Sequence, residues 1–207
     1  MKRIFPHIFA FDQADSTYRG RSYLITHPEG NIMIDSPEFS DNLVERIKED
    51  GGIRWIFITH SDDVGDARNF RGKFGSQICI HKKDSWSVKD ADMKFNGGEE
   101  LAGHAQLIHT PGHTLGSSML LAKLDQHYLF TGDTILTTAG GGLMANTRMY
   151  TKSPSDVMKS VRKLPQFKVD VILPAHGARS FVVEATEALK IMLEKMSGEQ
   201  IEPSKAL

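Results

Sequence analysis

The chain has 207 residues, of which 40% are hydrophobic and 25% are charged, so it is long and apolar enough to bury a sizeable core. Its net charge of −1 comes from interspersed acidic and basic residues, which indicates neither nucleic-acid binding nor a disordered acidic arm. No segment approaches the roughly 20 apolar residues of a membrane span. The N-terminal segment is too short and too interrupted for a signal peptide, and Cys79 is the single cysteine. We therefore expect one cytoplasmic domain over residues 1–207, with a buried thiol and without a disulfide or a thiolate zinc site.

Short β-rich segments bounded by Gly, Pro or Asp recur along the chain and are typical of strands. The expected strands are Ser22–Thr26, Asn31–Asp35, Arg54–Thr59, Gln77–Ile80, Ala105–His109, Ser117–Ala122, Tyr128–Thr131 and Val169–Leu173. Helical patterns lie between some of them, and strands dominate. This order predicts α+β or α/β layers rather than a purely parallel repeat.

Three helices are expected from their caps and apolar stripes. The first follows Ser40 as N-cap and ends before Gly51. The second begins at Ser153-Pro154, with Ser as N-cap and Pro in the first turn. The last spans about residues 183–196 and ends at Gly198. The glycine-rich stretch 139–142 lacks the Lys-Ser/Thr of a phosphate loop, so we expect an ordinary loop there.

Polar side chains follow four of the expected strands directly or after a short Pro-containing turn. These are His60 with Asp62 and Asp63, then His113, Asp133 and His176. Histidine and carboxylate together suit Zn, Fe or Mn, and strand ends are where such ligands are held. Any one of these residues alone would be interpreted as a turn residue or helix cap, but the set favours a shared metal site. The other six histidines are expected to be surface or satisfied core residues; they are His7, His27, His81, His104, His109 and His127.

The motifs around these residues resemble those of the metallo-β-lactamase superfamily, in its glyoxalase II-like branch. The sequence has Thr59-His60, Thr110-Pro-Gly-His-Thr-Leu-Gly-Ser117, Phe130-Thr-Gly-Asp-Thr134 and Leu173-Pro-Ala-His-Gly177, in the family's order. The resemblance implies a four-layer αββα sandwich of two mostly antiparallel sheets, with the metals at one edge. It also implies up to two divalent ions bridged by Asp133, one of them bound by His60 and His113 and the other by His176.

The first motif departs from the family pattern His-x-His-x-Asp-His. Without gaps, Asp62 stands at the second histidine, and Val64 and Gly65 replace the Asp-His pair. A two-residue shift recovers the aspartate as Asp66, but Ala67 still replaces its histidine, so two imidazoles are missing in either alignment. Carboxylates at these positions shift the preference from Zn towards Fe(II), Mn or Mg, and without a cation some of them would hold protons at neutral pH. Asp62 or Asp63 could instead cap the helix expected near Val64.

The resemblance implies a metal-dependent hydrolase that uses a metal-bound hydroxide on a small-molecule thioester, lactone or phosphodiester. One or two ions (Zn, Fe or Mn) would be bound by His60, His113, Asp133, His176, Asp62 and Asp66. Asp133 and Asp63 are the candidate catalytic residues, with Asp63 or one of its neighbours orienting the nucleophile. The alternative is a weakly metallated or metal-free binding domain, since two imidazoles are missing. Redox chemistry at iron is less favoured, because the diiron members carry an attached flavin domain for which there is no room.

Overall fold

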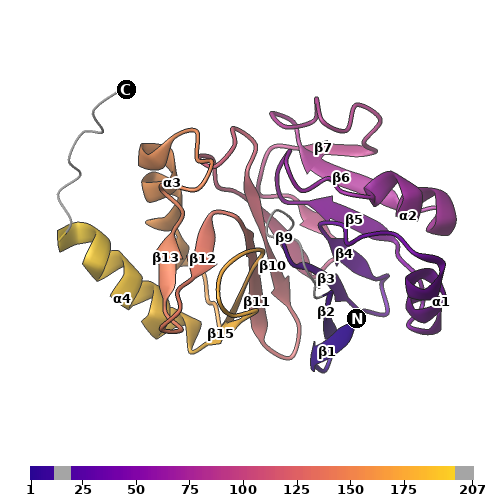
Figure 1. Ribbon diagram of the computed structural model, residues 1–207, viewed down its shortest axis with the longest axis horizontal. Coiled ribbons are helices and arrows are strands. Elements are labelled where there is room, and N and C mark those ends of the chain that lie inside the picture. Colours follow the sequence, from indigo (N-terminus) through magenta and orange to yellow (C-terminus); the bar gives the residue numbers. More distant parts are fainter. Residues whose placement is uncertain (12–19, 199–207) are drawn as a thin grey trace.

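The computed structural model describes residues 1–11 and 20–198, which form two large β-sheets, a β-hairpin and four helices (Figure 1). In spatial order, the first sheet contains β1 (Lys2–Phe5), β2 (Ile8–Phe11), β3 (Ser22–Ile25), β4 (Ile32–Ile34), β5 (Trp55–Ile58), β6 (Gln77–His81) and β7 (Met93–Phe95). The second contains β15 (Val182–Val183), β14 (Val171–Pro174), β11 (His127–Gly132), β10 (Ser118–Lys123), β9 (Ala105–His109) and β8 (Glu100–Leu101). The hairpin pairs β12 (Ile135–Thr137) with β13 (Leu143–Ala145).

The helices are α1 (Asp41–Glu49), α2 (Ala67–Phe74), α3 (Pro154–Val161) and α4 (Ala185–Gly198), with a 3₁₀ turn at Leu164–Gln166. Ser40 caps α1 by accepting a hydrogen bond from the backbone N–H of Leu43, and Ser153 caps α3 in the same way from Asp156. The three helices expected from the sequence are therefore confirmed. Within the described part of the chain, no helix has the length and apolarity that a membrane crossing needs.

The expectation of mostly antiparallel sheets is wrong for half of the first sheet. The pairs β4–β5, β5–β6 and β6–β7 are parallel, whereas β1 to β4 form an antiparallel meander. The reason is that α1 and α2 each connect two neighbouring strands, and a helical crossover returns the chain in the same direction. The second sheet has one parallel pair, β11–β14, among antiparallel ones.

Three apolar clusters define the four layers of the αββα sandwich. The central cluster lies between the sheets and includes Phe57 from β5 and Phe130 from β11. The second joins the outer face of the first sheet to α1 and α2, and the third joins the second sheet to α3, α4 and the hairpin. Strand β5 contributes Phe57 to the centre and Ile56 and Ile58 to the helix side, because successive side chains of a strand point to opposite faces.

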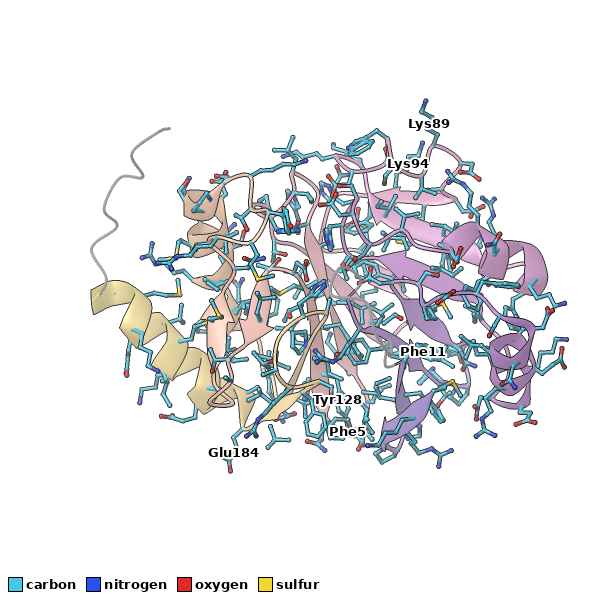
Figure 2. The ribbon with its side chains drawn as sticks, viewed as in Figure 1. Phe5, Phe11, Lys89, Lys94, Tyr128 and Glu184 are labelled. Carbon is cyan, nitrogen blue, oxygen red and sulfur yellow. The ribbon has the colours of Figure 1, made fainter. Side chains whose placement is uncertain are left out.

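Aromatic and thiol groups complete the central layer. Figure 2 shows Phe5 next to Tyr128, whose ring centroid lies 5.1 Å away in an edge-on contact between the two sheets. Cys79 is fully buried in the same layer, as expected, and burial raises the pKa of its thiol. This thiol packs as a small apolar group rather than as a nucleophile.

One edge of the sandwich gathers the loops that follow β5, β9, β11 and β14. Strands β9, β11 and β14 run in the same direction, so their carboxyl ends share an edge of the second sheet. The backbone N–H of Ser118 donates to the carbonyl of Thr59 at 2.9 Å and thereby ties this edge to the end of β5 in the first sheet. The loops that carry the predicted site residues therefore meet.

Candidate metal centre

His60 is held at the end of β5 by a buried chain of hydrogen bonds. The Thr59 hydroxyl donates to the carboxylate of Asp35, with oxygen–oxygen distances of 3.0 and 2.9 Å, and accepts from Nδ1 of His60 at 2.9 Å. When Asp35 is ionised, the hydroxyl donates to its carboxylate and accepts from the imidazole, which places the proton of neutral His60 on Nδ1. The lone pair of Nε2 therefore faces the centre, where the atom is buried without a hydrogen-bond partner.

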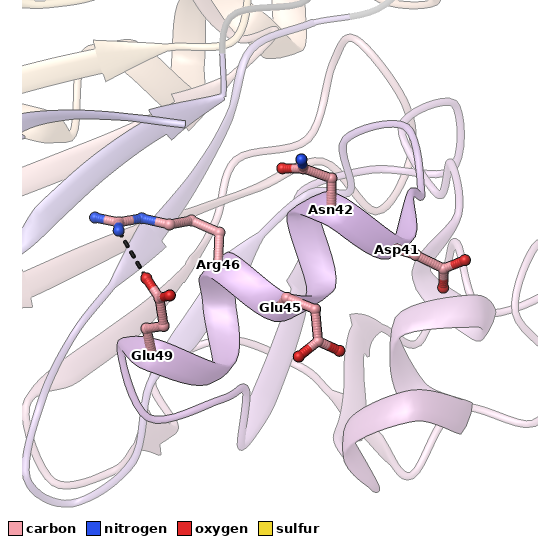
Figure 3. A pocket seen from close by; sticks show the side chains of 5 residues that line it. All are labelled: Asp41, Asn42, Glu45, Arg46 and Glu49. Carbon is pink, nitrogen blue, oxygen red and sulfur yellow. Dashed lines mark hydrogen bonds and ion pairs between the residues drawn. The ribbon is translucent and has the colours of Figure 1, made fainter.

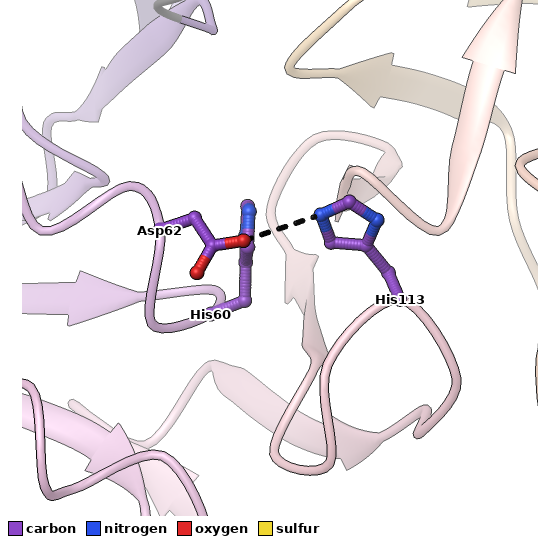
Figure 4. A group of neighbouring side chains, drawn as sticks. All are labelled: His60, Asp62 and His113. Atoms are coloured by element: carbon purple, nitrogen blue, oxygen red, sulfur yellow. Dashed lines mark ion pairs between the residues drawn. The ribbon is translucent and has the colours of Figure 1, made fainter. Parts of the chain in front are cut away.

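His113 comes from the loop after β9 and is 3% exposed. Its Nδ1 lies 3.4 Å from the Thr151 hydroxyl and 3.4 Å from the Asn146 amide, both in the loop before α3. Its Nε2 lies 3.9 Å from the carboxylate of Asp62, and its ring meets that of His60 edge-on at 4.8 Å. Figure 4 shows Asp62 and His113 facing each other beside the imidazole of His60.

Asp133 is the carboxylate to which the other motifs converge. One oxygen lies 3.8 Å from Nε2 of His60 and 3.6 Å from Nε2 of His113, and the other accepts from Nδ1 of His176 at 2.5 Å. Gly132, directly before it, has φ +50°, and a Cβ there would lie 2.7 Å from the Thr59 hydroxyl. Glycine at 132 therefore lets β11 turn against β5 so that Asp133 reaches the centre.

The three aspartates of the altered first motif lie in different places. Asp62 is 53% exposed in its side chain and groups with His60 and His113, while Asp63 is largely buried and groups with His60 and Asp133. Oδ2 of Asp63 is buried without a hydrogen-bond partner. Asp66 is outside both groups, because its oxygens accept from the backbone N–H of Phe39 and the amide of Asn69. Its predicted role as a ligand has no support from this arrangement.

The close approach of several carboxyl groups and imidazoles shifts the pKa values of the centre. Burial raises the pKa of Asp35 to about 8, and the neighbouring charge of Asp63 adds to this. Burial also raises the pKa of Asp63. Burial disfavours the charged form of His60, but the charges of Asp63 and Asp133 outweigh it and raise the pKa of that imidazole. Burial is the largest single effect on Asp133 and raises its pKa, but the hydrogen bond from His176 and the charges of His60, His176 and His113 together lower it. In the absence of a cation the cluster thus holds extra protons, as expected from the surplus of aspartates.

The residues present fit a divalent cation. Two buried atoms, Nε2 of His60 and Oδ2 of Asp63, have no partner, which is costly unless a further group binds there. Ligand atoms of each group lie within 4.8 Å of one another, and a mixture of imidazole and carboxylate suits Fe, Mn or Zn. Gly20 leaves the space beside them open, because a Cβ there would lie 3.1 Å from Oδ2 of Asp63 and 3.0 Å from the His176 ring.

Sequence reasoning missed two buried carboxylates that shape this centre. Asp35 acts on His60 through Thr59, and it has φ +53°, a conformation that the sequence does not signal. Asp84 is 1% exposed and accepts hydrogen bonds from the backbone of Ser61 and Gly116 and from the hydroxyl of Thr114. The only signal for Asp84 is its position shortly after a strand, which it shares with many turn residues.

Other polar groups lie apart from the centre. Figure 3 shows a shallow hollow whose five lining side chains, Asp41, Asn42, Glu45, Arg46 and Glu49, all come from α1. Their pairing along one helix face, such as Arg46 with Glu49 at 2.7 Å, is that of a solvated surface. His81 is buried and stacks on His109 at 3.9 Å, and His27 stacks on His104 at 3.7 Å.

The sandwich with this centre at its edge is the fold of metallo-β-lactamase proteins. The solved structure of ETHE1 from Myxococcus xanthus matches it with a TM-score of 0.71 at 21% identity, over 93% of this chain and 86% of that one. The family model described as the Metallo-beta-lactamase superfamily matches residues 5–195. The chain therefore belongs to the metallo-β-lactamase superfamily.

Two curated relatives are hydroxyacylglutathione hydrolases. The protein of Pelagibacter ubique is 29% identical over 156 residues, which are 70% of this chain and 62% of that protein. The protein of Shewanella loihica is 28% identical over 130 residues, which are 58% of this chain and 46% of that protein. The matched region thus spans less than two thirds of either relative.

Proposed function

We propose that this protein is a metal-dependent hydrolase of a small-molecule thioester, lactone or phosphodiester. The observation that carries the proposal is the convergence of three imidazoles on Asp133, beside the two unpartnered buried atoms of His60 and Asp63. The family and the hydroxyacylglutathione hydrolases among the relatives support this reaction class.

Four side chains would bind the principal ion: His60, His113, Asp133 and Asp62. When bound, a divalent metal lowers the pKa of water and polarises the oxygen of the scissile group. The Thr59 hydroxyl and Asp35 keep the lone pair of His60 directed at the centre. With two carboxylates among four ligands, we expect Fe(II) or Mn to compete well with Zn. A second, weaker ion would lie nearer His176 and Asp63.

Asp63 is the candidate general base. Its Oδ2 is buried and unpartnered beside Asp133, and burial raises the pKa of its carboxyl, which makes it a stronger proton acceptor. In this proposal, Oδ2 accepts the proton of the attacking water. His176 donates Nδ1–H to Asp133 and thereby fixes the orientation of that carboxylate. We also propose a cytoplasmic location, which the single buried cysteine supports.

The second candidate is a binding domain without hydrolase activity. Val64 and Gly65 stand where the family has an Asp-His pair, so the second ion position lacks an imidazole. The test loads wild type and Asp133→Ala with Mn, Fe(II) or Zn and measures turnover of thioester, lactone and phosphodiester substrates. The proposal predicts wild-type turnover that Asp133→Ala abolishes, with Asp90→Asn, at an exposed surface carboxylate, as the matched control. Turnover that survives Asp133→Ala undiminished contradicts it.

A further inference from the structure

Large exposed apolar side chains gather on the loops that border the metal centre. Among the described residues eight are exposed, and four of them lie in three such loops: Trp86 (62% exposed), Leu115 (61%), Met149 (51%) and Tyr150 (79%). The other four are scattered over the N-terminus, β13, β15 and α4. Single exposed apolar residues need no explanation, but a group beside a candidate active site indicates contact with an apolar partner.

The loops that carry Trp86 and Leu115 are linked by Asp84. The Asp84 carboxylate accepts from the hydroxyl of Thr114 and the backbone N–H of Gly116, the two residues that flank Leu115. The Asp84 carbonyl accepts from the backbone N–H of Ser87, which closes a turn with Trp86 inside it. Leu115 also lies two residues after His113, and its carbonyl accepts from the His109 ring. Both side chains are therefore carried by rigidly held backbone next to the centre.

Met149 is linked to His113 through Asn146. Its backbone N–H donates to the Asn146 side chain, and its carbonyl accepts from the Asn146 amide, which lies 3.4 Å from the His113 ring. Further along the loop, the backbone N–H of Lys152 donates to the carbonyl of His113. Three loops linked to His113 or its neighbours thus carry large apolar side chains that are exposed to solvent.

We propose that Trp86, Leu115 and Met149, here called the apolar rim, bind an acyl chain of the substrate, so that the protein prefers medium-chain acyl thioesters over short ones. This inference rests on the proposed function, because it assigns the substrate class of the same centre. Trp86 lies two residues after Asp84, Leu115 two residues after His113, and Met149 three residues after Asn146, so the proposal places the carbonyl at the centre and the acyl chain on these loops.

The test measures binding of the product-like carboxylates decanoate and acetate to metal-loaded protein. Trp86 is the exposed one of the chain's two tryptophans, so its fluorescence reports occupancy of the apolar rim. Decanoate, below the concentration at which it forms micelles, should shift the emission saturably and bind at least tenfold more tightly than acetate. Leu115→Ala should weaken decanoate binding at least threefold and leave acetate binding within twofold. Trp86→Ala, whose binding is measured by calorimetry because the fluorescent side chain is gone, should also weaken decanoate binding at least threefold and leave acetate binding within twofold.

Ile191→Ala is the matched control, since it truncates an aliphatic side chain exposed on α4. It should bind both carboxylates as wild type does. Equal affinities of wild type for decanoate and acetate overturn the inference, and so does a decanoate preference that survives both rim variants. The binding measurement does not depend on turnover. A protein that prefers decanoate but hydrolyses none of the substrates would therefore contradict the proposed function and support the apolar rim. A protein that hydrolyses acetyl and decanoyl thioesters with equal kcat/KM would keep the function and reject the apolar rim.

Discussion

The carboxylate of Asp84 accepts a short hydrogen bond, 2.5 Å, from the hydroxyl of Thr114, next to His113. The same carboxylate accepts from the backbone N–H of Ser61 at 3.0 Å, next to His60. One buried side chain from the first sheet thus links the loops that carry the two principal histidines. The distance between these imidazoles therefore depends on Asp84, although Asp84 is in neither ligand group.

Asp84→Asn is expected to loosen both loops. An amide offers one acceptor oxygen in place of two, and its NH₂ would face a donor that the carboxylate now satisfies. We expect a loss of roughly 1–3 kcal/mol in the free energy of unfolding and weaker metal binding. Urea denaturation and metal titration measure the two effects. Asp90→Asn, at an exposed carboxylate paired with Arg68 and Arg71, should change the free energy of unfolding by less than about 0.5 kcal/mol. An Asp84→Asn variant with the same free energy of unfolding and the same metal affinity as Asp90→Asn would show that the two loops do not depend on Asp84.

Thr59→Val is expected to weaken metal binding without unfolding the protein. Valine keeps the shape of the side chain but removes the hydroxyl between Asp35 and His60, so Nδ1–H of His60 loses its acceptor. Loss of such an outer partner typically costs about 10–100-fold in metal affinity. Thr59→Ser restores the hydroxyl and should restore most of the affinity. Equal metal affinities of the valine and serine variants, measured by competition with a chelator, would refute the positioning role.

His81 is expected to make the fold less stable in acid. Its Nε2–H donates to the carbonyl of Asn96 and its Nδ1 accepts from the backbone N–H of Lys83, so only the neutral ring satisfies both. Burial, with the neighbouring His109, lowers the pKa of His81 to about 4, from an ordinary value near 6.5. The unfolded chain therefore binds the proton first as pH falls. The contribution of neutral His81 to the free energy of unfolding is complete above pH 6.5 and declines between about pH 6.5 and 4. At pH 5 the loss is roughly 2 kcal/mol.

The measurement is the melting temperature of wild type and His81→Gln at pH 7.5 and pH 5. The variant should lose less stability between the two values than wild type does. His7→Gln, at an exposed histidine, should follow the wild-type profile. A His81→Gln profile parallel to that of wild type would assign the acid sensitivity to other groups.

The fold class was predictable from the sequence because the motif order and the strand boundaries are local signals. All eight expected strands are present. Seven others were missed because each has only two to four residues; they are β1, β2, β7, β8, β12, β13 and β15. The parallel half of the first sheet was missed because pairing direction depends on where a crossover helix packs. Convergence on Asp133 followed from four strand ends that share an edge. The different positions of Asp63 and Asp66 could not be predicted from the sequence. The two residues are only three positions apart, and the local backbone decides that Asp63 faces the centre while Asp66 accepts from the backbone N–H of Phe39.

The most direct test of a metal centre at Asp133 is elemental analysis of protein exposed to equal concentrations of Mn, Fe(II) and Zn and then freed of excess metal. The ligand set predicts about one tightly held divalent ion per wild-type chain, since imidazole and carboxylate ligands converge there. Asp133→Ala should lose most of it, while Asp90→Asn should retain it. Wild-type protein without stoichiometric metal, or an Asp133→Ala variant that keeps the full amount, would contradict the metal centre.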